Sequence, residues 1–196
     1  MELKKFILFK ISDFTCEFRT LNELDVCQDY ISGLRDQEKY IENIPIHISI
    51  SSQKQYINDI LYSTSDTICG LLINNELVGT AGVQSSVSLL KHIEAPAEYI
   101  TTIGIFLFNK SYRGMGFGKT LVWAATYLCH NSIQAKWFSA GMAKENIPSL
   151  KSFLSCGFRQ IYEDEESCRV LLNYSELTKP EFIKDETICE VDQRAK

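Results

Sequence analysis

The stretch Tyr112-Arg113-Gly114-Met115-Gly116-Phe117-Gly118-Lys119 places three glycines at alternate positions between two basic residues. An apolar run precedes it and an amphipathic pattern follows, which predicts a strand, a glycine-rich turn and the start of a helix. Free N–H groups at a helix N-terminus bind anions. The glycines permit positive φ and leave room for a bulky anion. This segment therefore predicts a phosphate-binding loop, with Arg113 and Lys119 adding charge.

Two other glycine-rich motifs do not fit this spacing. The dinucleotide fingerprint needs G-x-G-x-x-G, whereas the glycines here alternate. A P-loop needs a glycine five residues before Gly118, where this chain has Arg113. The remaining pattern is R-x-x-G-x-G, formed by Arg113, Gly116 and Gly118. Taken alone, it leaves open a turn that serves only chain geometry.

A second motif follows the glycine loop. Residue spacing predicts a helix over 117–130 and a short strand over 135–140. Asn146 is suited to cap a further helix, with Pro148 in its first turn and Gly157 ending it in a left-handed conformation. The resulting pattern is Asn146-x-x-Ser149-x-x-x-Phe153-x-x-x-Gly157-Phe158.

The two motifs, at this separation, resemble the GNAT family of acetyl-CoA-dependent N-acetyltransferases. The first is similar to the family's pyrophosphate loop and the second to its N-x-x-S…G-F signature. The resemblance covers residues 14–174 and implies an α+β fold, with a mixed, mostly antiparallel sheet flanked by helices. We expect one domain over 1–177, and a polar tail or peripheral addition over 178–196. Other patterns predict helices over 22–34 and 52–62, and strands over 6–11, 16–20, 67–73, 77–84, 99–108, 159–162 and 169–174.

The resemblance also implies where acetyl-CoA binds. The cofactor would lie between two central strands that splay apart, with its pantetheine arm on the backbone of Phe106 and Phe108. Asn146 would approach that arm, and Phe153 would pack near the cofactor. The pyrophosphate would bind beside Arg113 on the amides of Gly114, Met115, Gly116, Phe117, Gly118 and Lys119.

The implied reaction is direct attack of an amine on the thioester carbonyl. It needs a base or water relay, backbone donors for the oxyanion, and a proton donor for the thiolate. Many family members carry Tyr where this chain has Phe153, which cannot donate. We therefore expect Ser149, one turn earlier, to donate the proton, with helix capping as its alternative role. Glu98 is the first candidate base, and a solvated surface charge is the alternative for it and for the further candidates His92, Glu94 and Glu166.

The acceptor is suggested by a finer likeness. Residues 14–21, 29–38 and 138–149 look like the RimJ/RimL-type branch, and especially like members that acetylate amino sugars on nucleotide carriers. The same branch includes enzymes that acetylate protein N-termini. We expect a small-molecule amine, foremost a nucleotide-linked amino sugar, with Arg35, Lys39 and Tyr40 as candidate carrier contacts. A protein N-terminal acetyltransferase and a non-catalytic CoA-binding module stay as alternatives.

The composition argues against several other classes of protein. A net charge of −5 over 196 residues disfavours nucleic-acid and anionic membrane partners. Seven cysteines and three histidines lack disulfide-framework or zinc spacing, so we expect free thiols and no metal. The sequence has neither a run that would make a membrane helix nor a signal-peptide pattern, which predicts a cytoplasmic protein. We expect a monomer or a homodimer.

Overall fold

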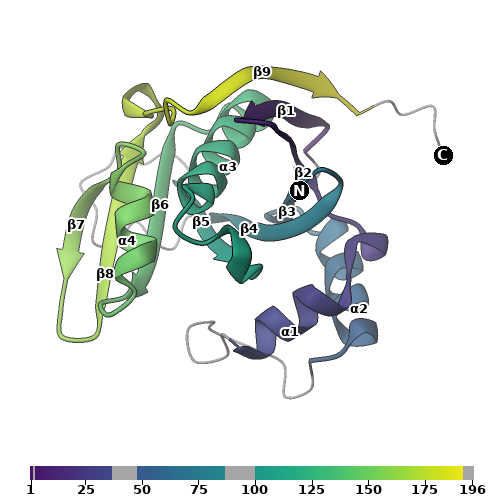
Figure 1. The fold of residues 1–196 in the computed structure, drawn as a ribbon. Coiled ribbons are helices and arrows are strands. Elements are labelled where there is room, and N and C mark those ends of the chain that lie inside the picture. Colours follow the sequence, from purple (N-terminus) through teal and green to yellow (C-terminus); the bar gives the residue numbers. More distant parts are fainter. Residues whose placement is uncertain (2, 37–47, 87–99, 192–196) are drawn as a thin grey trace.

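The computed structural model describes residues 1, 3–36, 48–86 and 100–191. In this part of the chain, one nine-stranded sheet carries helices on both faces (Figure 1). The strands are β1 (Lys5–Ile11), β2 (Phe14–Thr20), β3 (Asp66–Ile73), β4 (Glu76–Ser86), β5 (Ile100–Leu107), β6 (Trp137–Ala143), β7 (Arg159–Glu163), β8 (Ser167–Asn173) and β9 (Ile183–Glu190). The helices are α1 (Gln28–Asp36), α2 (Ile50–Leu61), α3 (Phe117–Ile133) and α4 (Ile147–Leu154).

The strand order across the sheet is β7-β8-β6-β5-β4-β3-β2-β1-β9. The pair β5–β6 is parallel, and the other neighbouring pairs are antiparallel. This confirms the predicted α+β fold with a mixed, mostly antiparallel sheet. The two N-terminal hairpins also form as predicted. Asn74 and Asn75 turn the second hairpin with φ of 49° and 69°, a conformation that Asn tolerates better than most residues.

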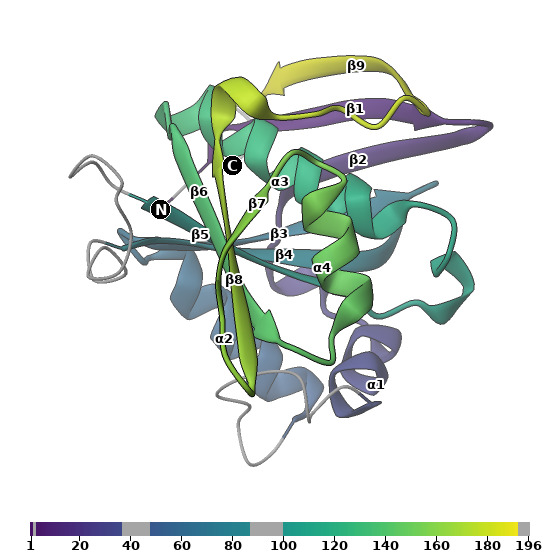
Figure 2. The same cartoon turned by 90° about the vertical axis from the view of Figure 1, so that its left-hand side faces the viewer.

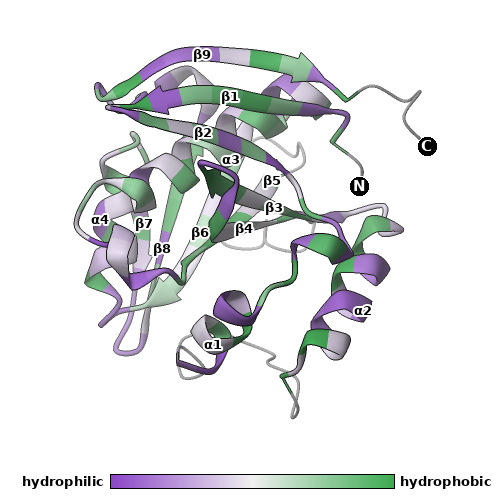
Figure 3. Ribbon diagram, turned by 45° about the vertical axis from the view of Figure 1, so that its right-hand side comes forward, coloured by the Kyte–Doolittle hydropathy of each residue, from purple (hydrophilic) through white to green (hydrophobic). Residues whose placement is uncertain are grey.

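The sheet divides the interior into two apolar cores. On one face, α3 and α4 cover the larger core, in which Leu121 and Leu128 are fully buried. On the other face, α1 and α2 cover a smaller core that contains Ile31, Ile57 and Phe108. Figure 3 shows hydrophobic and hydrophilic positions alternating around α2, as expected for a helix with one buried side.

The helix expected over 22–34 is divided in two. Asn22 and Asp25 form a capping box around a short 3-10 turn, Glu23–Asp25, and α1 begins only at Gln28. Arg19 of β2 holds that turn with two hydrogen bonds of 2.7 Å to the Asp25 carboxylate. Because the cap and this ion pair fix the turn against the sheet, the regular helix starts later than the apolar spacing predicts.

The C-terminal residues extend the sheet. Residues 183–190 lie in the segment expected as a polar tail or peripheral addition, and they form β9, which pairs with β1 at the sheet edge. Figures 1 and 2 show β9 running alongside β1. Ile183 is fully buried in the larger core. This strand therefore ties the chain after β8 to the N-terminal hairpin.

None of the helices within the described ranges has the length and apolar character needed to cross a bilayer.

Candidate functional site

A fork in the sheet lies beside the glycine loop. The strands β5 and β6 pair at Ile100, Thr101 and Thr102, whose partners are Trp137, Phe138 and Ser139. Beyond this third rung, β5 continues along β4 as far as Leu107, and β6 continues along β8 as far as Ala143. The two strands run at an angle to each other (Figure 2). In the described chain, residues 103–107 thus have one edge without a strand partner, and such an edge offers backbone hydrogen bonds to an extended ligand.

The glycine loop connects this free edge to α3. Gly114 has φ of 76° and Gly116 has φ of 91°, so both adopt the left-handed conformation predicted for them. Gly116 is the N-cap of α3 and supplies no side chain to the first N–H groups of the helix. A Cβ added at Gly114 would meet no heavy atom of the described chain within 4 Å. The loop therefore combines room for a ligand with helix N–H groups that can bind an anion.

Gly118 serves a different purpose from the other two glycines. It lies inside α3, so the predicted need for positive φ does not apply to it. A Cβ at this position would lie 2.7 Å from Oγ of Ser152. Gly118 is therefore the point where α3 packs closely on α4, and this contact sets the position of α4 beside the loop.

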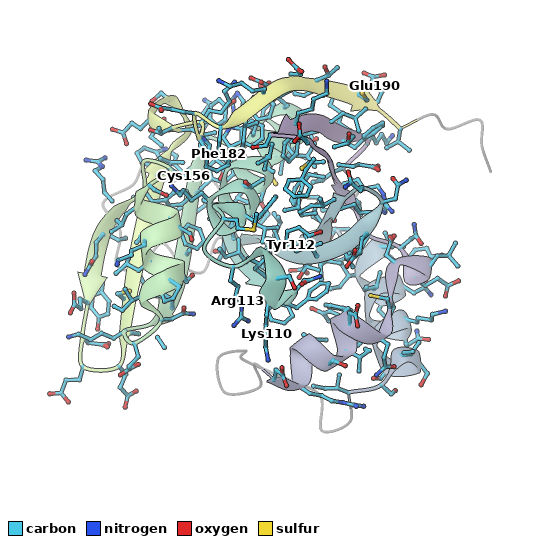
Figure 4. The ribbon with its side chains drawn as sticks, in the orientation of Figure 1. Lys110, Tyr112, Arg113, Cys156, Phe182 and Glu190 are labelled. Atoms are coloured by element: carbon cyan, nitrogen blue, oxygen red, sulfur yellow. The ribbon has the colours of Figure 1, made fainter. Side chains whose placement is uncertain are left out.

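Basic side chains surround the loop. Arg113 is exposed, and its Nη2 donates to the carbonyl of Leu107 at 3.4 Å. Lys110 pairs with Asp36 of α1 at 2.5 Å, and its ammonium holds the pKa of that carboxyl below its ordinary value. Lys119 lies near Phe182 of the C-terminal segment, with Nζ 5.8 Å from the ring centroid. Figure 4 labels Lys110, Arg113 and Phe182.

Cys156 is buried behind the loop. Its thiol donates to the carbonyl of Lys119 at 3.4 Å, and burial raises its pKa to about 12. A thiol with such a pKa stays protonated at neutral pH and is a poor nucleophile. Cys156 therefore supports the first turn of α3 and is no candidate for covalent chemistry.

The start of α4 lies at the end of β6. The Asn146 side chain accepts a hydrogen bond from the backbone N–H of Ser149 at 3.3 Å, which confirms Asn146 as N-cap. The hydroxyl of Ser149 takes no part in this bond. Ser149 precedes Ser152 by three positions, so both lie on one side of α4, and the Ser152 hydroxyl lies beside Gly118.

The predicted aromatic residues are mostly buried. Phe153 is 1% exposed and contacts the ring of Phe158, with centroids 5.0 Å apart. Phe108 is 3% exposed and lies against Tyr30 and Phe106. Phe153 belongs to the larger core and Phe108 to the smaller one, so they lie on opposite faces of the sheet.

Several candidate residues fall outside the described chain: Lys39, Tyr40, His92, Glu94 and Glu98. Two others are placed by the structure. Arg35 donates to the carbonyl of Ile48 at 2.6 Å, at an exposed position beside α2. Glu166 lies in the turn between β7 and β8. Among the residues that are described, no cluster of His, Cys, Asp or Glu is arranged to hold a metal ion.

The α1/α2 face of the sheet carries a polar row that sequence reasoning missed. Asp66, Gln84, Thr102 and Ser139 are successive partners on four adjacent strands, so their side chains share one face. The row ends at the fork, where the hydroxyls of Thr102 and Ser139 are 3.1 Å apart. Burial raises the pKa of Asp66, but hydrogen bonds from Ser63, Ser65 and Gln84 outweigh it and leave the pKa below its ordinary value.

Next to this row lies an open floor of two glycines. Gly82 and Gly104 face each other on β4 and β5, and a Cβ at either would meet no described heavy atom within 4 Å. Phe106 lies beyond them on the same face and packs on the smaller core. The spacing Gly82-x-Gln84 and Thr102-x-Gly104 was visible in the sequence, but joining them required the strand register.

Comparisons with known proteins agree with this geometry. The sequence matches the family described as Acetyltransferase (GNAT) domain over residues 17–159. In a sequence comparison, no curated protein matches the chain.

Solved structures with a similar fold include three complexes. RimJ of Mycobacterium smegmatis, in complex with CoA-disulfide, is 15% identical with a TM-score of 0.70, covering 91% of this chain and 93% of its own. Spermidine N-acetyltransferase from Vibrio cholerae, in complex with CoA and spermine, is 14% identical with a TM-score of 0.64, covering 82% and 96%. Aminoglycoside acetyltransferase AAC(6')-Ib, in complex with coenzyme A and kanamycin, is 18% identical with a TM-score of 0.63, also covering 82% and 96%.

Proposed function

The chain belongs to the GNAT family of acetyl-CoA-dependent N-acetyltransferases, and on this premise we propose that it acetylates a primary amine of a small molecule. The observation that carries the proposal is the fork between β5 and β6 beside the glycine loop. Among the described residues, this fork joins a strand edge without a strand partner, the N-terminus of α3 and the end of the polar row. We also propose that the protein works in the cytoplasm, as the cysteine pattern of its sequence indicates.

The residues of this site fit acetyl-CoA. The amides of residues 114–119 suit a pyrophosphate, because Gly114 and Gly116 adopt positive φ at the start of α3 and a Cβ at Gly114 would meet no described heavy atom within 4 Å. Arg113 and Lys119 supply positive charge next to them. The backbone around Phe106 and Phe108 suits the amide groups of the pantetheine arm. Because the cap uses the Asn146 oxygen, we propose that its amide nitrogen faces that arm.

Groups of the protein then stabilise the negative charge that develops in the reaction and transfer the protons. Acetyl-CoA supplies an acetyl group activated as a thioester. Backbone N–H groups of β5 beyond Thr102, where the described chain gives this edge no strand partner, donate to the oxygen that becomes negative in the transition state. Ser149, or a water bound to it, donates a proton to the departing sulfur as the C–S bond breaks. The donor regains a proton from the one that the attacking amine loses, passed on by the base and water. Glu98 remains our proposed base, acting directly or through water on the amine.

We propose an amino sugar on a nucleotide carrier as the acceptor. The α1/α2 face supports this choice, because no described heavy atom lies within 4 Å of a Cβ at Gly82 or Gly104, and the neighbouring amide and hydroxyl groups suit the hydroxyls of a sugar. An aminoglycoside acetyltransferase also shares the fold. The alternative is a protein N-terminus, which the similarity to RimL, a ribosomal L7/L12 alpha-N-protein acetyltransferase, favours.

Two measurements test the proposal in sequence. Calorimetry with CoA examines the cofactor site, and we expect saturable binding with one CoA per chain. Release of the CoA thiol from acetyl-CoA is then followed with four acceptor sets: nucleotide-linked amino sugars, aminoglycosides, polyamines and short peptides. Turnover with the first set supports the full proposal. Turnover with peptides alone would replace the acceptor by the alternative, and failure to bind CoA would overturn the enzyme assignment.

A further inference from the structure

We propose that Phe182 is a positioning residue that holds the glycine loop in its anion-binding conformation. The inference rests on the acetyl-CoA site proposed above, and it adds to that site a residue from the C-terminal segment, which neither sequence motif contains. Phe182 therefore links the residues after β8 to cofactor affinity.

The segment that carries Phe182 is fixed on both sides. Before it, the backbone N–H of Thr178 donates to the carbonyl of Cys156 at 3.0 Å, which ties the chain to the end of α4. After it, Ile183 is fully buried in the larger core, and its N–H donates to the carbonyl of Pro180 at 3.0 Å. Figure 4 labels Phe182 where the chain passes toward β9. The backbone is thus anchored both before and after Phe182.

The ring of Phe182 packs directly on the loop. A Cβ built on Gly116 would lie 2.7 Å and 2.9 Å from two carbons of this ring, so the ring occupies the space beside the Gly116 α-carbon. Gly116 is the N-cap of α3 and has φ of 91°. On the same ring, the ammonium of Lys119 lies 5.8 Å from the centroid, within the range of a cation–π contact. One aromatic side chain therefore contacts both the loop backbone and one of its charges.

These contacts have a consequence for ligand binding. Glycine has more backbone freedom than any other residue, so an unsupported Gly116 would sample many conformations in which the α3 amides do not converge. The Phe182 ring removes part of that freedom before the ligand arrives, which lowers the entropy lost on binding. Its contact with the Lys119 ammonium also holds that charge near the expected pyrophosphate, which strengthens their attraction.

The test compares CoA affinity with turnover. For Phe182→Ala, we expect the Kd for CoA from calorimetry to rise about tenfold, with a parallel rise in the KM for acetyl-CoA. At saturating acetyl-CoA, the kcat and the KM for the amine should stay within about twofold, because the ring does not line the acceptor face. Phe182→Tyr keeps the ring and should restore the Kd to within about twofold of the wild type. Amide exchange at residues 114–119 should quicken in Phe182→Ala only.

Ile188→Ala is the matched control. Ile188 lies on β9 and pairs with Ile7, away from the loop, so its loss weakens the same strand without touching Gly116. The proposal is overturned if Phe182→Ala binds CoA like the wild type, or if Ile188→Ala raises the Kd equally. If Phe182→Ala does not unfold cooperatively, Phe182→Leu takes its place, and an unchanged Kd there is equally decisive. Failure of the wild type to bind CoA would instead reject the proposed function.

Discussion

At the scale of a residue, one hydrogen bond shows that the part Ser149 takes in capping α4 does not involve its hydroxyl, the proposed proton donor. The cap of α4 uses its backbone N–H, and the acceptor is the Asn146 side chain. Replacing the Ser149 hydroxyl therefore leaves the cap intact. A loss of activity in such a variant would then be due to the missing hydroxyl, because the helix is unchanged.

For Ser149→Ala we expect the kcat to fall at least about tenfold, because the departing sulfur loses its proton donor. The Kd for CoA and the free energy of unfolding should not change. Ser155→Ala removes a hydroxyl at the other end of α4, where it donates to the carbonyl of Ser152, and should keep full turnover. Full turnover in Ser149→Ala would remove this residue from the mechanism.

A substitution at Gly104 tests whether the acceptor binds on the α1/α2 face. A methyl group at Gly104 would meet no heavy atom of the described residues within 4 Å, so the fold should tolerate Gly104→Ala. If the glycine floor receives the acceptor, the KM for the amine should rise about tenfold, which corresponds to about 1.4 kcal/mol. The Kd for CoA should remain unchanged, and the two constants measured in one variant control each other. An unchanged KM for every acceptor would place the amine elsewhere.

At the scale of elements, α1 is positioned by a close approach to β5. A Cβ at Gly33 would lie 2.3 Å from Cβ of Phe108, which follows β5 at the entrance to the glycine loop. The Lys110–Asp36 ion pair joins the end of the same helix to the turn after Phe108. The helix thus lies directly over the end of the strand that would carry the pantetheine arm.

Gly33→Ala should therefore force α1 away from Phe108 and destabilise the fold by about 1–3 kcal/mol. Ser32→Ala, at the exposed neighbouring position, should stay within about 0.5 kcal/mol of the wild type. Urea unfolding of both variants measures the difference. Equal stability of the two would mean that α1 is not held against β5 in this way.

At the scale of the whole molecule, β9 connects the C-terminal part of the described chain to its N-terminal part. It pairs with β1, and its first residue, Ile183, enters the core that also contains α3. The segment before it reaches the glycine loop through Phe182. Global stability and the shape of the cofactor loop are therefore linked through the C-terminal residues.

Ile183→Ala should lower the free energy of unfolding by about 2–5 kcal/mol, since it removes a fully buried side chain from the larger core. Ile188→Ala, at a partly exposed position of the same strand, should cost less. Both are measured by urea unfolding. Equal losses would show that the strand contributes through its pairing alone.

Local features of the fold follow from short stretches of the amino-acid sequence. The glycine loop, the Asn146 cap and the Asn74–Asn75 turn depend on residues within a few positions of one another, and the conformations they need are properties of single residue types. The likeness of two motifs to a known family then extended these local features to a whole fold. Even here, the capping box at Asn22 shortened α1, because an ion pair from β2 reinforced it.

Tertiary structure alone decided the fork, the polar row, the glycine floor and the partner of β9. Each depends on which strands are neighbours and in what register, and these contacts join residues far apart in the chain. A shift of one residue in register would turn Thr102 and Gly104 to the opposite face of the sheet. The composition of a strand does not encode that register, which is set by packing across the whole sheet.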